Sequence, residues 1–232
     1  MPSSMTEYYQ VRAQEFERVY DKPERQADLQ KLRGWLAGET RGRTVLEVAC
    51  GTGYWTAVAA TTASAIVATD FNLGPLEIAR AKGLGEHVRF EQADAFALPD
   101  YATAFDAGMA HFWWSHVALA DQQRFLTHFA SKLRPTAKLL MMDNTHVPDS
   151  SGPVSRTDAA GNTYQLRTLA SGAEYEVLKN FPTAGELRAA LATVCASVEV
   201  LQLTYYWALS ATLAELTHPG RGTRKRDTPR PI

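Results

Sequence analysis

Three acidic residues are spaced so that each would lie at or near the end of a successive β-strand. Glu47 lies inside the apolar run VLEV, Asp70 ends the run VATD, and Asp94 follows the next run in the segment QADAF. The carboxyl ends of parallel strands meet at one crevice of an open α/β sheet, where these carboxylates would surround a shared ligand. They can accept hydrogen bonds from an ammonium group, ribose hydroxyls and an adenine amino group, respectively. One such acid is often only a helix cap, but three in succession favour a binding site.

A glycine-rich loop begins four residues after Glu47. Gly51 and Gly53 lie where the first apolar run gives way to a helical pattern, and glycine lets the backbone approach a ligand closely. A lone G-x-G is equally consistent with a tight turn. A nicotinamide-binding fingerprint needs a third glycine, where this chain has Thr56. Glu47 and Asp94 would also repel a pyrophosphate, so the loop favours a cofactor without phosphates.

The elements that must position these groups alternate between short apolar runs and amphipathic stretches. Strands are expected at 45–49, 65–69, 88–91, 105–110 and 139–142, with helices at 54–60, 73–81 and 121–133. This alternation predicts right-handed crossovers and a mostly parallel, Rossmann-like α/β sheet.

Both ends of the chain add further elements. Residues 7–35 are expected to form one or two helices, with Pro23 as a break or a helix start. Runs at 163–169 and 174–181 predict a hairpin inserted after the fifth strand. Thr183 is a candidate N-cap for a helix at 184–194, with Glu186 three residues on. Runs at 198–203 and 205–210 predict an antiparallel edge and complete a seven-stranded sheet.

Composition and charge limit the function classes. The 232 residues are 45% hydrophobic and 21% charged, with a formal net charge of −1. This balance is typical of a soluble globular protein and offers no basic field for nucleic acid or a membrane. Cys50 and Cys195 are the only cysteines and follow no metal-binding spacing, so we expect reduced thiols, no metal and a cytoplasmic location.

The combination of EVACGTG, VATD and ADAF resembles the motifs of the class I S-adenosylmethionine-dependent methyltransferases over residues 44–143. Ala49 departs from the pattern, since many members have a glycine there. The resemblance implies an enzyme that uses S-adenosyl-L-methionine and releases S-adenosyl-L-homocysteine. It implies that the cofactor contacts Tyr9, Arg12, Glu47, Ala49, Gly51, Gly53, Tyr54, Trp55, Asp70, Phe71, Asn72, Asp94, Ala95, Phe96, Ala110 and His111.

The layout of the whole chain is similar to small-molecule O-methyltransferases such as the phosphonate O-methyltransferase of the dehydrophos pathway. The resemblance implies one domain over residues 1–217, with a helical lid at 1–40 and a cap at 150–182; 218–232 would be a basic, disordered tail. Tyr9 and Arg12 lie three residues apart, on one helical face, so Arg12 could meet the cofactor's carboxylate and a tyrosine its sulfonium. The alternative is a surface helix whose aromatic residues only pack on the domain.

The segment HFWWSHV after the fourth strand would lie at the methyl end of the pocket. His116 is a candidate general base or hydrogen-bond partner of the substrate, although a structural histidine is as consistent with the sequence. Trp113 and Trp114 suggest an apolar acceptor wall or simply core packing. The candidate substrate-binding residues are Tyr20, Trp113, Trp114, Asn144, His146, Arg167 and Lys179.

Arg167 and Lys179 flank the hairpin turn, and their relative orientation depends on its length. A two-residue turn would put them on opposite faces, whereas a three-residue loop would put both on one face, able to grip a phosphonate or carboxylate. An anionic acceptor needs no base, so this hypothesis competes with the base role of His116.

The sequence thus predicts O-methylation of a small molecule with a carboxylate, phosphonate or hydroxyl acceptor. The alternatives are a cofactor-binding module without catalysis and a nicotinamide-dependent dehydrogenase. No nucleic-acid or membrane partner is expected, and the chain would be a monomer or homodimer.

Overall fold

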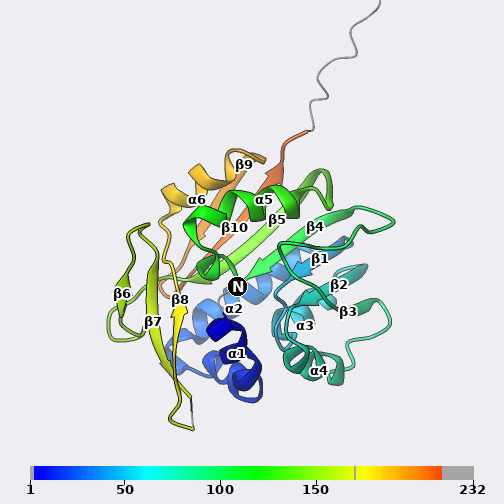
Figure 1. The fold of residues 1–232 in the computed structure, drawn as a ribbon. Coiled ribbons are helices and arrows are strands. Elements are labelled where there is room, and N and C mark those ends of the chain that lie inside the picture. The colour runs from blue at the N-terminus through cyan, green and yellow to red at the C-terminus, as the bar shows by residue number, and fades with distance from the viewer. Residues whose placement is uncertain (1–2, 170, 216–232) are drawn as a thin grey trace, which may run out of the picture.

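A seven-stranded sheet forms the centre of the molecule in the computed structural model, which describes residues 3–169 and 171–215 (Figure 1). The tail expected at 218–232 lies outside the described residues. The strand order is β3-β2-β1-β4-β5-β10-β9. The strands are β1 (Thr44–Val48), β2 (Ala65–Asp70), β3 (Val88–Gln92), β4 (Phe105–His111), β5 (Leu133–Asn144), β9 (Cys195–Gln202) and β10 (Tyr206–Leu213).

The direction of the strands confirms the predicted mixed sheet. Strands β1 to β5 pair in parallel, and the C-terminal strand β10 pairs antiparallel with both β5 and β9. Strand β10 is inserted between these two, so β9 forms the outer edge. The carboxyl ends of β1, β2 and β3 consequently meet at one edge of the sheet, as the position of the acids requires.

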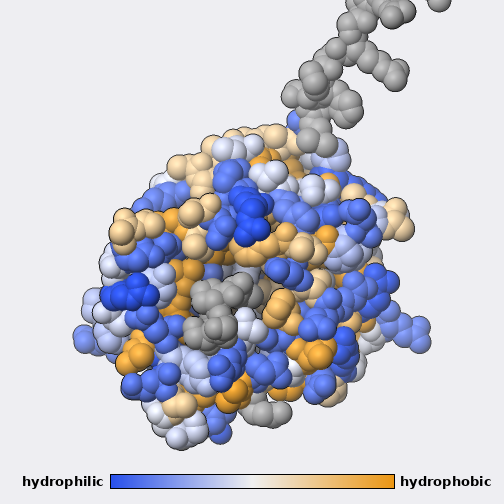
Figure 2. All heavy atoms as spheres, viewed as in Figure 1, coloured by the Kyte–Doolittle hydropathy of each residue, from blue (hydrophilic) through white to orange (hydrophobic). Residues whose placement is uncertain are grey.

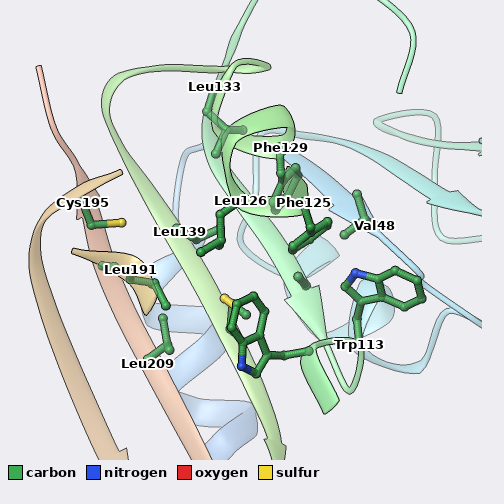
Figure 3. Packing of buried hydrophobic residues seen from close by; sticks show 14 of the residues in the cluster. Val48, Trp113, Phe125, Leu126, Phe129, Leu133, Leu139, Leu191, Cys195 and Leu209 are labelled. Atoms are coloured by element: carbon green, nitrogen blue, oxygen red, sulfur yellow. The ribbon is translucent and has the colours of Figure 1, made fainter. Parts of the chain in front are cut away.

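Helices cover both faces of the sheet. Alternate residues of one strand point to opposite faces, so Val45 and Leu46 belong to different hydrophobic clusters. One face packs against α5 (Gln122–Ala130) and α6 (Ala184–Leu191), as the side chains around Phe125 in Figure 3 show. The other face packs against α2 (Gln26–Glu39), α3 (Tyr54–Ala60) and α4 (Leu73–Ala81).

Local sequence signals explain where two helical segments begin. Lys22 is extended and Pro23 occupies the first position of a short 3₁₀ helix, η2 (Pro23–Arg25), that leads into α2. Helix α6 begins with a capping box. The Glu186 N–H donates to the Thr183 hydroxyl at 3.2 Å, and the Thr183 N–H donates to Glu186 Oε2 at 2.7 Å. Both helix starts are those that the sequence predicts.

Two segments far apart in the chain lie beside the carboxyl ends of the parallel strands. Helix α1 (Ser3–Arg12) and the 3₁₀ helix η1 (Ala13–Tyr20) lie between α4 and the hairpin, in blue at the front of Figure 1. The hairpin belongs to a second, three-stranded sheet of β6 (Arg156–Thr157), β7 (Thr163–Thr168) and β8 (Glu174–Leu178).

The register of the hairpin decides between the two expected turns. Arg167 lies opposite Tyr175, which is the register of the three-residue loop. Lys179 lies opposite Thr163, since its N–H donates to the Thr163 carbonyl at 2.8 Å. Positions 163 and 167 share one face of β7, so Arg167 and Lys179 face the same side.

Candidate active site

A cavity of about 250 Å³ lies where these segments meet the carboxyl ends of the strands. The N-terminal helices, the loop after β1, the loop after β4 and the hairpin all contribute to its wall. On the face shown in Figure 2, hydrophobic and hydrophilic residues are interspersed, and several hydrophobic residues lie near the centre.

The loop after β1 follows a backbone path that favours glycine. Gly51 and Gly53 have φ angles of +57° and +78°, and a Cβ on Gly53 would lie 3.0 Å from the Cβ of Ala79. Ala49, at the position where the family motif often has glycine, has a φ of +53°. The chain therefore adopts a left-handed turn there with an alanine, and its side chain lines the cavity.

Asp70 holds this loop in place and presents its carboxylate to the cavity. Its Oδ2 accepts from the Gly51 N–H at 2.9 Å, and its Oδ1 accepts from the Asn72 N–H at 2.8 Å. Burial raises the pKa of the carboxyl, while these backbone N–H groups act in the opposite direction. Each oxygen keeps a lone pair for a ligand, as a ribose diol would require.

Glu47 is a second buried carboxylate on the cavity wall. Its Oε2 accepts from the Thr56 hydroxyl at 2.6 Å, and the side chain is otherwise enclosed. Burial raises its pKa to about 7, and the nearby charge of Asp70 acts in the same direction. A cationic ligand group beside it would favour the ionised form.

His111, at the end of β4, is buried without a partner for either ring nitrogen among the described residues. Burial lowers its pKa to about 3, so the ring is neutral near pH 7 and retains one donor and one acceptor. Buried polar groups are rarely left unpaired, and this side chain lines the cavity. His111 thus offers two hydrogen-bonding positions to a bound molecule.

His116 connects the N-terminal helix to the hairpin. Its Nδ1 lies 2.6 Å from the Leu178 carbonyl, which can only accept, so Nδ1 carries the proton. Its Nε2 accepts from the Tyr9 hydroxyl at 2.8 Å. Burial and the charge of Lys179 lower the His116 pKa to about 3. The ring is therefore neutral and already hydrogen-bonded on both sides.

Lys179 is held in a buried ion pair. Its Nζ donates to Asp143 Oδ1 and to Ser115 Oγ, each at 2.7 Å, and the side chains of Lys179 and Asp143 are 4% and 0% exposed. Burial alone would raise the pKa of Asp143, but the ammonium of Lys179 holds it below its usual range. The positive charge of Lys179 is accordingly balanced by Asp143.

Arg167 lines the same end of the cavity with its charge unbalanced. Its guanidinium donates to the side-chain oxygen of Gln165, and no carboxylate among the described residues lies within 4.0 Å of it. The cavity thus has two carboxylates at its glycine-loop end and cations at its hairpin end.

The structure brings most of the sequence-predicted residues together. The following line the cavity: Tyr9, Arg12, Tyr20, Glu47, Ala49, Gly51, Tyr54, Trp55, Asp70, Phe71, Asn72, Ala95, His111, Trp113, His116, Asn144, Arg167 and Lys179. The roles assigned to them remain predictions.

Three of the predicted cofactor residues are not part of the cavity wall, and their roles stay predictions. Gly53 faces Ala79 and the ring of Phe90, and Ala110 is fully enclosed in the sheet. Asp94 turns toward its own loop, where its Oδ1 accepts from the Phe96 N–H at 2.8 Å. None of the three lines the cavity.

Phe96, Trp114 and His146 are also outside the cavity wall. Phe96 packs against Trp113, with ring centroids 6.1 Å apart, and lies under the Arg124 guanidinium. Trp114 is 1% exposed and belongs to the core beneath α5. Its neighbour Trp113 belongs to the same cluster but also lines the cavity. His146 packs edge-on against Phe181. Of the two tryptophans, Trp113 alone lines the cavity.

Sequence reasoning missed two charged residues at the hairpin end. Asp143 follows the apolar run LLMM, and a search for acids at every strand end would have included it. Arg25, which also lines the cavity, carries no signal in the sequence because it lies in a short charged segment before α2.

The fold and the arrangement of acids around a glycine loop are typical of nucleoside-binding α/β proteins. Among the described residues, no helix is long and apolar enough to cross a membrane. The family described as "Methyltransferase domain" matches residues 45–136. A demethylmenaquinone methyltransferase of Clavibacter sepedonicus is 30% identical over 121 residues, which cover 49% of each chain. The match thus spans about half the length of that relative.

Solved structures are similar over nearly the whole chain. DhpI in complex with SAH has a TM-score of 0.73 and 26% identity, over 91% of this chain and 96% of that one. A DhpI–SAM–HEP complex has a TM-score of 0.74 and 26% identity, over 90% of this chain and 95% of that one. A Burkholderia thailandensis 1,6-didemethyltoxoflavin-N1-methyltransferase has a TM-score of 0.63 and 18% identity, over 92% of this chain and 88% of that one. This similarity shows a shared fold.

Residues 45–136 of the chain therefore match a methyltransferase-domain family, and DhpI, which is similar over nearly the whole chain, is solved in complex with S-adenosylmethionine. The residues present fit that molecule. Asp70 offers acceptors suited to ribose, Glu47 an acceptor for an ammonium group, and His111 two unused ring nitrogens.

Binding of S-adenosylhomocysteine is expected to depend on pH through Glu47. With a pKa of about 7 in the free protein, this carboxyl must lose its proton to accept from the ligand's ammonium group. Affinity should therefore fall by about tenfold per pH unit below 7 and level off above it. Calorimetry from pH 5.5 to 8.5 measures this, and Glu47→Gln should remove the slope. A slope that persists in the variant would contradict the assignment.

Proposed function

We propose that this protein transfers a methyl group from S-adenosylmethionine to an oxygen of a small acid, a carboxylate or a phosphonate. The observation that carries the proposal is the division of charge within one cavity. Carboxylates lie at the glycine-loop end, and the unbalanced guanidinium of Arg167 lies at the hairpin end with Lys179 on the same face. The complex of DhpI with SAM and HEP supports a small-molecule acceptor.

The state of His116 favours an acceptor that is already anionic. A hydroxyl acceptor must lose a proton, which requires a base with an available lone pair and a pKa near the working pH. His116 Nε2 is engaged by the Tyr9 hydroxyl, and its pKa is about 3. A carboxylate or phosphonate oxygen needs no base, so the cations alone are sufficient to position it.

Each group of the cavity has a part in the proposed reaction. When bound, S-adenosylmethionine supplies an electrophilic methyl group, which the acceptor oxygen attacks while the C–S electron pair passes to sulfur. Arg167 holds the acid so that one oxygen faces that carbon, and alignment of this kind supplies much of the rate. Tyr9, bonded to His116, closes the cavity over the reacting atoms and excludes water.

A two-part experiment tests this function. Calorimetry with S-adenosylhomocysteine measures cofactor binding, and mass spectrometry screens acids, phenols, thiols and amines for a gain of one methylene unit. Ester formation on acids alone is the expected result. Cofactor binding without any product would instead identify a non-catalytic binding module, and products on amines or thiols alone would contradict O-methylation.

Replacing Arg167 by glutamine should raise the KM for the acid about 10- to 100-fold, because a charge-assisted contact contributes about 1.5–3 kcal/mol. Affinity for S-adenosylhomocysteine should stay within about twofold. Arg156→Gln is the matched control, since Arg156 lies on the neighbouring strand in an exposed ion pair with Glu176. Steady-state kinetics of both variants measure the difference, and equal effects in the two would count against a role for Arg167.

A further inference from the structure

A second guanidinium lies buried at the hairpin end of the cavity. Arg25 is 7% exposed, lines the cavity, and its Nε has no hydrogen-bond partner among the described residues. Its remaining nitrogens donate to Asn144 Oδ1 at 3.3 Å, to the Ser150 carbonyl at 3.1 Å and to Ser150 Oγ at 2.9 Å. All of these partners are neutral.

The acids nearest in sequence do not balance this charge. Asp28 accepts from the Tyr205 N–H at 2.9 Å, and Glu24 accepts from Ser150 Oγ at 3.4 Å. No carboxylate among the described residues lies within 4.0 Å of the Arg25 nitrogens. A buried charge without a counter-ion is costly. The rings of Tyr205 and Tyr206, whose centroids lie 5.2 and 5.6 Å from the Arg25 Cζ, offset part of that cost, and a bound anion would lower it further.

Arg25 and Arg167 flank the same short segment. Arg25 donates to Ser150, and an added Cβ on Gly152 would lie 4.0 Å from a terminal nitrogen of Arg167. Residues 150 and 152 are two positions apart, so their Cα atoms are within about 7 Å. With Lys179 balanced by Asp143, the two guanidinium groups leave an excess of positive charge at this end of the cavity.

We propose that Arg25 binds a second acidic group of the acceptor, so that the substrate is a short diacid with one acid at Arg167 and the other at Arg25. This inference rests on the proposed function and narrows its substrate class. The acid at Arg167 receives the methyl group, while the acid at Arg25 stays ionised and sets the length and charge of molecules that fit.

Calorimetry on the complex with S-adenosylhomocysteine tests the proposal. Succinate, glutarate and 3-phosphonopropionate are each compared with the monoacid of equal length, which is butyrate, valerate or propylphosphonate. In the wild-type protein at least one diacid should bind 10-fold or more tightly than its partner. Arg25→Gln should bring that ratio to about one, and Arg25→Lys should retain part of it.

The outcomes separate the two proposals. Equal affinity of every diacid and its monoacid in the wild type would overturn the role of Arg25 while leaving the proposed function standing. Binding of S-adenosylhomocysteine without binding or methylation of any acid would overturn the proposed function itself.

A structural role for Arg25 gives a different pattern. If Arg25→Gln weakens the binding of the diacid and of its monoacid alike, or weakens the binding of S-adenosylhomocysteine, Arg25 does not bind the second acidic group and the proposal is wrong. Thermal unfolding of both Arg25 variants confirms that the compared proteins are folded.

Discussion

Replacing Asp70 by asparagine is expected to weaken the binding of S-adenosylhomocysteine by about 100-fold. The two carboxylate oxygens accept from Gly51 and Asn72 and retain lone pairs for the cofactor. Asparagine has a single acceptor oxygen, so one of the two N–H groups would face an amide NH₂ group instead. Charge-assisted contacts to a ligand contribute about 1.5–3 kcal/mol, and about 2.7 kcal/mol corresponds to 100-fold.

Titration calorimetry measures this loss directly. Asp121→Asn is the matched control, because Asp121 is on the surface and pairs with Arg124 three residues on. That variant should bind the cofactor product with unchanged affinity. If the Asp70→Asn variant binds S-adenosylhomocysteine with an affinity within threefold of the wild type, the carboxylate does not contact the ligand.

Replacing Lys179 by methionine is expected to lower the free energy of unfolding by about 3–5 kcal/mol, because removal of one partner of a buried ion pair leaves an uncompensated charge. In a chain of 232 residues this corresponds to a fall of roughly 10 °C in the unfolding midpoint. Asp143 would keep its Ser115 contact but lose the ammonium that holds its pKa low. Differential scanning calorimetry at pH 7 measures the change.

The double variant Lys179→Met, Asp143→Leu distinguishes the cost of an unpaired buried charge from the cost of altered packing in the free energy of unfolding. It removes both charges at once and should recover part of the lost stability. The recovery is incomplete because the backbone N–H groups of Ser115 and Asn144, which donate to Asp143, lose their acceptor. The pH dependence supplies a further check. A depressed Asp143 pKa means that the pair's contribution is present above the ordinary carboxyl range and is lost as pH falls through the lower, folded value. The double variant should lack this acid-side loss.

The fold and the glycine-loop end of the cavity could be predicted because their signals are local. Strand and helix periods, the CGTG turn and acids at strand ends each occupy a few consecutive residues. The backbone places Glu47 and Asp70 on the cavity wall as those signals require. The end of the third strand was also located correctly, and there Asp94 accepts from the Phe96 N–H through Oδ1, while its contact with the cofactor stays a prediction.

The arrangement of the hairpin end of the cavity depended on contacts between distant segments. Either hairpin turn was compatible with the sequence, and only the register of Arg167 opposite Tyr175 selects one face for both cations. The balance of Lys179 by Asp143 joins residues 36 positions apart. Trp113 and Trp114 are adjacent tryptophans, and the sequence does not show which of them reaches the cavity. In the structure both pack in the core cluster, and Trp113 also lines the cavity.

The division of the cavity also has a consequence for how such enzymes diversify. The region shared with the methyltransferase family, residues 45–136, contains Glu47 and Asp70. Arg25, Arg167 and Lys179 all lie outside it. Under the proposed function, changes in the N-terminal helices or the hairpin would exchange one acceptor for another and leave Glu47 and Asp70 unaltered, so substrate choice would evolve separately from binding of the methyl donor.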